Sequence, residues 1–290
     1  MVADSRDTSI ALLRIDTRGG SFACEAQGPD GGPLVLCAHG FPDHPRTFRS
    51  LGRALAGRGF RVVAPWLRGY SPSTLEGPFD ARRIGADLAA LAQALSPSRA
   101  AAIIGHDWGA AATYEALSGH GERFARAVTL AVPHPVAFAR NLLSSPTQVR
   151  RSAYMAFLNV PWLSERVVAR RDFALVDRLW KGWSPGYTPE ASYMRELKDC
   201  LARSMPAPIL YYRAIASSLR AELGRRPRRI EVPTLYLHGA DDGCIGAEIA
   251  RGQERFFRAP LRSVVVARAG HFLHLEAAAE VEREILAWLT

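Results

Sequence analysis

Short, uninterrupted apolar runs alternate with stretches of helical periodicity through the first half of this 290-residue chain. Such runs lack the polar alternation of a strand with one wet face, so they indicate strands that are buried on both faces. They lie at residues 33–38, 60–65, 101–104 and 127–132, after a first strand expected at 10–15. Because helical segments separate them, the sequence predicts an α/β protein with a mostly parallel, doubly wound sheet.

The alternation stops at about residue 139 and resumes near residue 230. Residues 139–229 show helical periodicity without clear strands and hold Trp162, Trp180 and Trp183, three of the six tryptophans. Strands are expected again at 234–238 and 263–267, before a last helix at 277–289. We therefore expect a core formed by residues 1–138 and 230–290, with residues 139–229 inserted between its halves as a helical cap.

The net excess of positive charge lies in the expected cap. The formal net charge is +9, and residues 139–229 hold 17 Arg and Lys against 7 Asp and Glu. This excess fits a solvated, arginine-rich surface, or a basic face that meets an anionic substrate or partner; a homodimer through the cap is also left open. Nucleic acid is not expected as a partner, because no recognised binding motif accompanies the charge.

No stretch approaches the ~18 apolar residues that a membrane span needs, and charges are spread through the first 30 residues. We therefore expect neither a membrane span nor a signal peptide. The four cysteines, Cys24, Cys37, Cys200 and Cys244, have neither C-x-x-C nor zinc-finger spacing. They are expected to be reduced thiols in a cytoplasmic protein that needs no metal or organic cofactor.

The first candidate for chemistry is Gly105-His106-Asp107-Trp108-Gly109, between an expected strand and a helix of small residues. This is the pattern of a nucleophile elbow, in which small flanking residues let the chain turn sharply. The turn would lift Asp107 above the sheet, at the positive end of the helix. The alternative is that Asp107 only caps the helix.

Three further loops follow expected strands. His39-Gly40-Phe41-Pro42-Asp43 could offer the N–H of Phe41 to an oxyanion, with the N–H of Trp108 as a second donor. Asp242 and His271 would complete a triad in the order nucleophile, acid, histidine. Asp241 is left open as the acid, and so is a proton-relay role for His274; Asp242 could also be a turn cap, and His271 a structural histidine.

An aspartate nucleophile decides the reaction class. It is already ionised at neutral pH, so it needs no base, and it can displace a leaving group from saturated carbon. The product is an ester of Asp107, against which His271 can activate water. The oxyanion donors then act on the former carboxylate oxygen. The pattern predicts hydrolysis at an electrophilic alkyl carbon through a covalent intermediate.

With these motifs the chain resembles the α/β-hydrolase superfamily, and within it the epoxide hydrolases, from about residue 20 to 290. The resemblance implies an α/β-hydrolase fold and conversion of a small-molecule epoxide to a vicinal diol. It also implies two cap tyrosines that bind the epoxide oxygen. These are assigned to Tyr154, seven residues before Pro161, and to Tyr212, which precedes Arg213. His39, Phe157 and Trp108 are the expected substrate-binding residues.

Two other functions are compatible with these motifs. Haloalkane or haloacid dehalogenases also resemble this chain and share the Asp nucleophile, but Phe41 offers no side-chain donor for a halide. A non-catalytic ligand-binding member of the fold is the alternative of another class. The chain departs from the epoxide hydrolase pattern at Trp66, where Asp is usual, and at Ser71, where Gly is usual.

Overall fold

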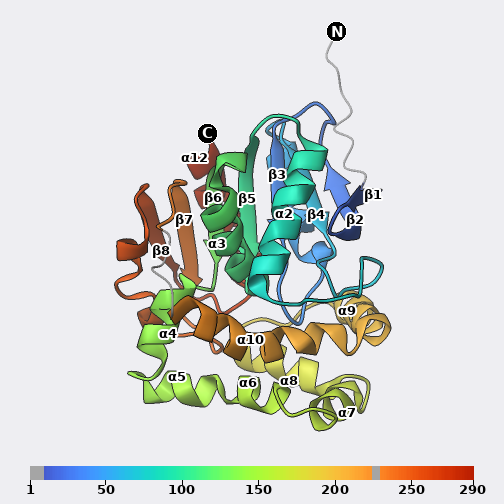
Figure 1. The fold of residues 1–290 in the computed structure, drawn as a ribbon, viewed down its shortest axis with the longest axis vertical. Helices are drawn as coiled ribbons and strands as arrows, with labels where there is room; N and C mark the ends of the chain where they lie inside the picture. The colour runs from blue at the N-terminus through green and yellow to red at the C-terminus, as the bar shows by residue number, and fades with distance from the viewer. Residues whose placement is uncertain (1–9, 224–228) are drawn as a thin grey trace.

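Eight strands form one sheet in the computed structural model, which describes residues 10–223 and 229–290 (Figure 1). Their order across the sheet is β1-β2-β4-β3-β5-β6-β7-β8. The pairs β1–β2 and β2–β4 are antiparallel, and the pairs from β4 to β8 are parallel. The strands span Ala11–Thr17 (β1), Gly20–Gln27 (β2), Leu34–Ala38 (β3), Arg61–Pro65 (β4), Ala100–His106 (β5), Phe124–Leu130 (β6), Thr234–Gly239 (β7) and Leu261–Val266 (β8). The predicted α/β fold with a mostly parallel sheet is confirmed.

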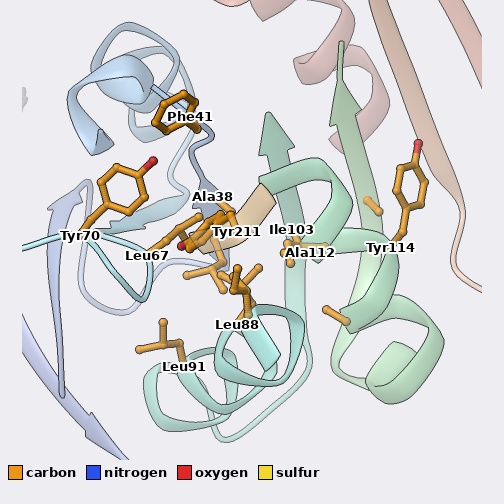
Figure 2. Close-up of a cluster of buried hydrophobic side chains, with 14 of the residues drawn as sticks. Ala38, Phe41, Leu67, Tyr70, Leu88, Leu91, Ile103, Ala112, Tyr114 and Tyr211 are labelled. Carbon is orange, nitrogen blue, oxygen red and sulfur yellow. The ribbon is translucent and has the colours of Figure 1, made fainter. Parts of the chain in front are cut away.

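The two faces of the sheet carry separate apolar clusters. Along β3, Leu34, Leu36 and Ala38 join the cluster that includes residues of α2 (Ala81–Leu95) and α3 (Trp108–His120), part of which Figure 2 shows. Val35 and Cys37 join the cluster that includes residues of α1 (Arg49–Ala56) and α12 (Ala278–Leu289). Since alternate residues of a strand point to opposite faces, both faces of β3 are buried.

The sequence analysis missed β2. Its run GSFACEAQ contains Glu25 and Gln27, which interrupt the apolar pattern although both are buried. The structure explains their burial through α1. Arg49 donates two hydrogen bonds to the Glu25 carboxylate, at 2.6 and 2.8 Å, and its carbonyl accepts one from Gln27. A buried carboxylate is tolerated when it is paired in this way.

Seven helices lie between β6 and β7 in the described part of the chain, across one end of the sheet (Figure 1). They are α4 (Pro135–Leu142), α5 (Pro146–Arg151), α6 (Ala153–Leu158), α7 (Leu163–Ala169), α8 (Ala174–Trp183), α9 (Ala191–Ser204) and α10 (Ala207–Leu223). The assignment of residues 139–229 to a separate cap domain stays a prediction. Residues 1–9 of the expected core and 224–228 of the expected cap lie outside the described residues. No helix in residues 10–223 or 229–290 combines the length and apolar character needed to cross a membrane.

A buried ion pair joins the loop after β4 to α2. Arg68 is 2% exposed and Asp87 3% exposed. The Arg68 guanidinium binds both Asp87 oxygens, at 2.7 and 2.9 Å, and donates to the carbonyls of Glu76 and Gly19. It thereby holds the loop against α2 and against the β1–β2 turn.

We expect Arg68→Met to lower the free energy of unfolding by about 3–5 kcal/mol, because it leaves the Asp87 charge buried without its main partner. Urea unfolding followed by circular dichroism measures the change. The matched control is Arg262→Met, which removes a surface pair with Glu284 and is expected to cost at most about 1 kcal/mol. Equal effects of the two substitutions would contradict the role given to Arg68.

Candidate active site

Asp107 lies at the sharp turn between β5 and α3. Its backbone has φ +51° and ψ −117°, a region that costs a non-glycine residue about 1–3 kcal/mol. Glycines permit the turn: a Cβ at Gly109 would collide with the Ala38 carbonyl, and one at Gly105 with the Gly109 carbonyl. The strained turn leaves the carboxylate directly before the first residue of α3, where the helix dipole favours a negative charge.

The loop after β3 supplies a donor to this carboxylate. The N–H of Phe41 donates to Asp107 Oδ1 at 2.7 Å. The loop can come this close because position 40 is glycine, where any Cβ would overlap the Asp107 side chain. The N–H of Trp108 is the first amide of α3, among the helix amides that have no partner within the helix.

His271 links two carboxylates. Its Nδ1 lies 2.9 Å from Asp242 Oδ2, and its Nε2 lies 3.4 Å from Asp107 Oδ2. The second Asp242 oxygen accepts from the N–H groups of Cys244, at 2.7 Å, and Ile245, at 2.9 Å. Asp241, the alternative acid, is exposed. The structure therefore brings Asp107, His271 and Asp242 into one line of contacts.

The neighbouring charges shift the pKa values of His271 and Asp242. Burial alone would lower the pKa of His271, but Asp242 and Asp107 raise it to about 10. Burial would raise the pKa of Asp242, and the positive His271 holds it below its usual value. A protonated imidazole between two carboxylates is thus the resting state at neutral pH.

The two expected tyrosines lie together, near enough to Asp107 for its charge to raise the pKa of both. Their ring centroids are 5.7 Å apart, and the Tyr212 ring contacts Phe41 and Trp108 edge-on, at 5.3 and 5.4 Å. Burial and the Asp107 charge raise the pKa of Tyr212. Its hydroxyl is buried and has no hydrogen-bond partner among the described residues. The Tyr154 hydroxyl lies 3.5 Å from Cys244 Sγ.

The structure gives His39 a different place from the one expected. The side chain is fully buried, its Nδ1 lies 2.9 Å from the Gly40 carbonyl, and its Nε2 accepts from the N–H of Leu67. Burial lowers its pKa to about 4, so the ring is neutral at pH 7. Both nitrogens hold the backbone, which leaves no polar atom for a substrate, and the expected contact is corrected to a part in fixing the loop. Phe157 is half-buried and packs against the apolar core, and Trp108 packs against Tyr212.

Sequence reasoning missed Trp183, at the end of α8. Its carbonyl accepts from the N–H groups of Gly243 and His271, both at 3.0 Å, and its ring lies 5.2 Å from the His271 ring. One residue of the inserted helices thus ties together the loops that carry Asp242 and His271. The sequence identifies Trp183 only as one of three tryptophans in the expected cap, because a hydrogen bond to a backbone carbonyl does not depend on the side chain.

The model of the alpha/beta hydrolase family matches residues 35–284, which include every residue of this triad. The chain belongs to that family.

Curated relatives extend the similarity over nearly the whole chain. Epoxide hydrolase 3 of Xenopus tropicalis is 27% identical over 284 residues, covering 94% of this chain and 76% of the relative. Epoxide hydrolase A of Mycobacterium tuberculosis (strain ATCC 25618 / H37Rv) is 26% identical and covers 95% and 96%. The AB hydrolase superfamily protein YfhM of Bacillus subtilis (strain 168) is 27% identical and covers 95% and 96%.

Solved structures of epoxide hydrolases are also similar to this chain. One described as belonging to novel epoxide hydrolases from metagenomes of hot environments has a TM-score of 0.83 at 26% identity, and covers 97% of this chain and 99% of its own. An inhibitor complex of an epoxide hydrolase from Bacillus megaterium shares the fold, with a TM-score of 0.85 at 22% identity, covering 96% and 99%. The resemblance predicted from the motifs, to an α/β hydrolase of the epoxide hydrolase type, is confirmed.

The raised pKa of His271 makes the stability of this hydrolase depend on pH. The folded state holds a proton that the unfolded state releases near pH 6.5, so the stabilisation is present below pH 6.5 and is lost as pH rises towards 10. Over that range the free energy of unfolding should fall by up to about 1.4 kcal/mol per pH unit. Urea unfolding of the native chain and of His271→Gln at several pH values measures it. Parallel curves for the two proteins would contradict the assignment.

Proposed function

We propose that this chain hydrolyses an epoxide to a vicinal diol through an ester formed on Asp107. One observation carries the proposal. The Asp107 carboxylate is held between the Phe41 amide and the His271 imidazole, and its charge acts on both tyrosines. The buried Tyr212 hydroxyl has no hydrogen-bond partner in the part of the chain that the structure describes. A buried phenol that lacks an acceptor is suited to a ligand oxygen. The names of the curated relatives support the same substrate class.

In the first step Asp107 attacks a ring carbon of the epoxide, and the carbon–oxygen bond of the ring breaks. Tyr212 and Tyr154 donate hydrogen bonds to the oxygen that leaves, and the alkoxide takes the proton of one of them. The tyrosinate is reprotonated through water by the His271 imidazolium, which leaves the imidazole neutral. A phenol stabilises that charge without a fixed positive charge of its own. Residues 139–229 act here as a cap domain, because both tyrosines come from it.

In the second step water attacks the Asp107 ester. Esterification has removed one of the two negative charges that raised the pKa of His271, and the imidazole, which gave up its proton in the first step, takes a proton from the attacking water. Asp242 orients the imidazole. The N–H groups of Phe41 and Trp108 stabilise the oxyanion of the tetrahedral intermediate. The bond from the Asp107 carbonyl carbon to the diol oxygen then breaks, the diol oxygen takes the proton of the new carboxyl group, and the Asp107 carboxylate is regenerated beside protonated His271.

We expect His271→Gln to form the ester and not to release it, since nucleophilic attack needs no base whereas hydrolysis does. Incubation with styrene oxide should raise the mass of the intact protein by the mass of one epoxide, and peptide mapping should place the addition on Asp107. The double variant Asp107→Ala/His271→Gln is the control and should show no addition. An addition that persists in the double variant would contradict the covalent step on Asp107.

We expect Tyr212→Phe to slow ester formation by about 10²–10³-fold, the usual effect of losing one oxyanion donor. The neighbouring Tyr211→Phe is the matched control, because the Tyr211 hydroxyl donates to the Arg68 carbonyl. It should cost stability of about 1 kcal/mol and leave the rate nearly unchanged. Pre-steady-state kinetics with styrene oxide measures both rates, and equal losses would contradict the role of Tyr212.

A further inference from the structure

A second polar cluster lies in the interior, behind the catalytic histidine. Asp43, His106 and His274 are at most 2% exposed. Each offers a ligand atom, and the three atoms lie within 4.8 Å of one another. They come from the loop after β3, the end of β5 and the short helix α11 (Leu273–Glu276).

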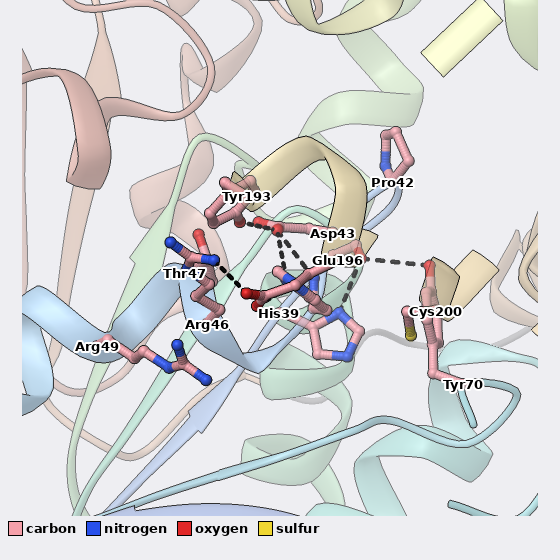
Figure 3. Close-up of polar contacts among 12 residues, drawn as sticks. His39, Pro42, Asp43, Arg46, Thr47, Arg49, Tyr70, Tyr193, Glu196 and Cys200 are labelled. Carbon is pink, nitrogen blue, oxygen red and sulfur yellow. Dashed lines mark hydrogen bonds and ion pairs between the residues drawn. The ribbon is translucent and has the colours of Figure 1, made fainter. Parts of the chain in front are cut away.

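The outer atom of each side chain is held by a neighbour. Asp43 Oδ1 accepts from the His44 N–H at 2.8 Å and from the Tyr193 hydroxyl, as Figure 3 shows for the tyrosine. His106 Nε2 lies 3.0 Å from the His271 carbonyl. His274 Nε2 lies 2.5 Å from Thr47 Oγ1. Such outer contacts typically orient the ligands of a metal.

The other atom of each side chain has no hydrogen bond. Asp43 Oδ2, His106 Nδ1 and His274 Nδ1 are all buried without a partner within residues 10–223 and 229–290. Buried polar atoms are rarely left in this state, so three of them in one cluster call for a ligand.

Two of these atoms, His106 Nδ1 and Asp43 Oδ2, can be assigned a free lone pair. A carbonyl oxygen only accepts, so His106 Nε2 must carry the proton that it donates to His271. A neutral imidazole carries one proton, so with that proton on Nε2 the Nδ1 atom presents a lone pair. Asp43 Oδ1 already accepts two hydrogen bonds, so Oδ2 is the oxygen left to bind a cation.

We propose that Asp43, His106 and His274 bind a zinc ion. Two imidazole nitrogens and one carboxylate oxygen are the donor set of zinc sites in which a water molecule is the fourth ligand. When His274 donates from Nε2 to Thr47, one cation satisfies all three lone pairs, whereas one water molecule can donate to only two of them. Zinc bonds of about 2.0–2.2 Å place ligand atoms roughly 3.4 Å apart, so the ligand atoms need to close by up to about 1.4 Å.

The position of this site gives it a structural role. Its ligands lie two residues after Phe41, directly before Asp107 and three residues after His271. A metal there would bind together the three segments that carry the oxyanion donor, the nucleophile and the base. The proposal does not depend on the substrate or on the covalent step.

Metal content after refolding tests the site, because a buried ion enters as the chain folds. The full chain is unfolded in guanidinium chloride with EDTA, refolded with zinc or with EDTA, desalted and analysed by mass spectrometry for metals. We expect about one zinc per chain after refolding with zinc, and a Tm several degrees above that of the EDTA sample. Negligible zinc with an unchanged Tm would overturn the proposal and leave a bound water.

Variants locate the ion. His274→Gln and Asp43→Asn should each reduce the retained zinc to roughly a tenth or less. His134→Gln, a buried histidine stacked on Phe256, and His271→Gln are the controls, and both should retain the metal. Should the cluster variants fail to fold, anomalous diffraction at the zinc edge from native crystals decides the position. Zinc found at the triad, or retained in full by folded His274→Gln, would overturn the proposal.

Discussion

The carboxylate of Asp107 is the charge around which this molecule is arranged. It is 6% exposed, and an ion so deeply buried needs partners that replace water. One partner, the Phe41 amide, follows β3, and the other, the His271 imidazole, follows β8. Three strands separate β3 from β8 in the sheet. The loops must therefore reach over the ends of the central strands, and glycine at position 40 is what allows the first of them to approach.

Two further charged groups, His271 and Asp242, continue the contacts of Asp107 into the interior. Asp107, His271 and Asp242 form a line of negative, positive and negative groups, and both carboxylates raise the pKa of the imidazole. A change in the charge of Asp107 therefore changes the basicity of His271. The Trp183 carbonyl accepts hydrogen bonds from the loops of Asp242 and His271, so the inserted helices help to fix the positions of these two residues.

Much of the fold could be predicted because apolar runs and helical periodicity report directly on burial. The strand β2 was missed for a physical reason. Glu25 and Gln27 lie inside, and their partner Arg49 is distant in sequence, so the local pattern reads as polar. The choice of Tyr212 over Tyr211 is a case where two neighbours look alike in sequence. In the structure the Tyr211 hydroxyl donates to a carbonyl, and the Tyr212 hydroxyl is left without a partner among the described residues.

The sequence by itself determined the alternation of strands and helices apart from β2, the turn at Asp107 and the loops from which its partners come, because short-range periodicity and glycine spacing encode them. Only the tertiary structure decided that Asp242 and not Asp241 meets the histidine, that His39 holds backbone, and that Asp43, His106 and His274 converge. These outcomes depend on distances between loops far apart in the chain. Packing of the whole sheet sets those distances, and no local pattern contains them.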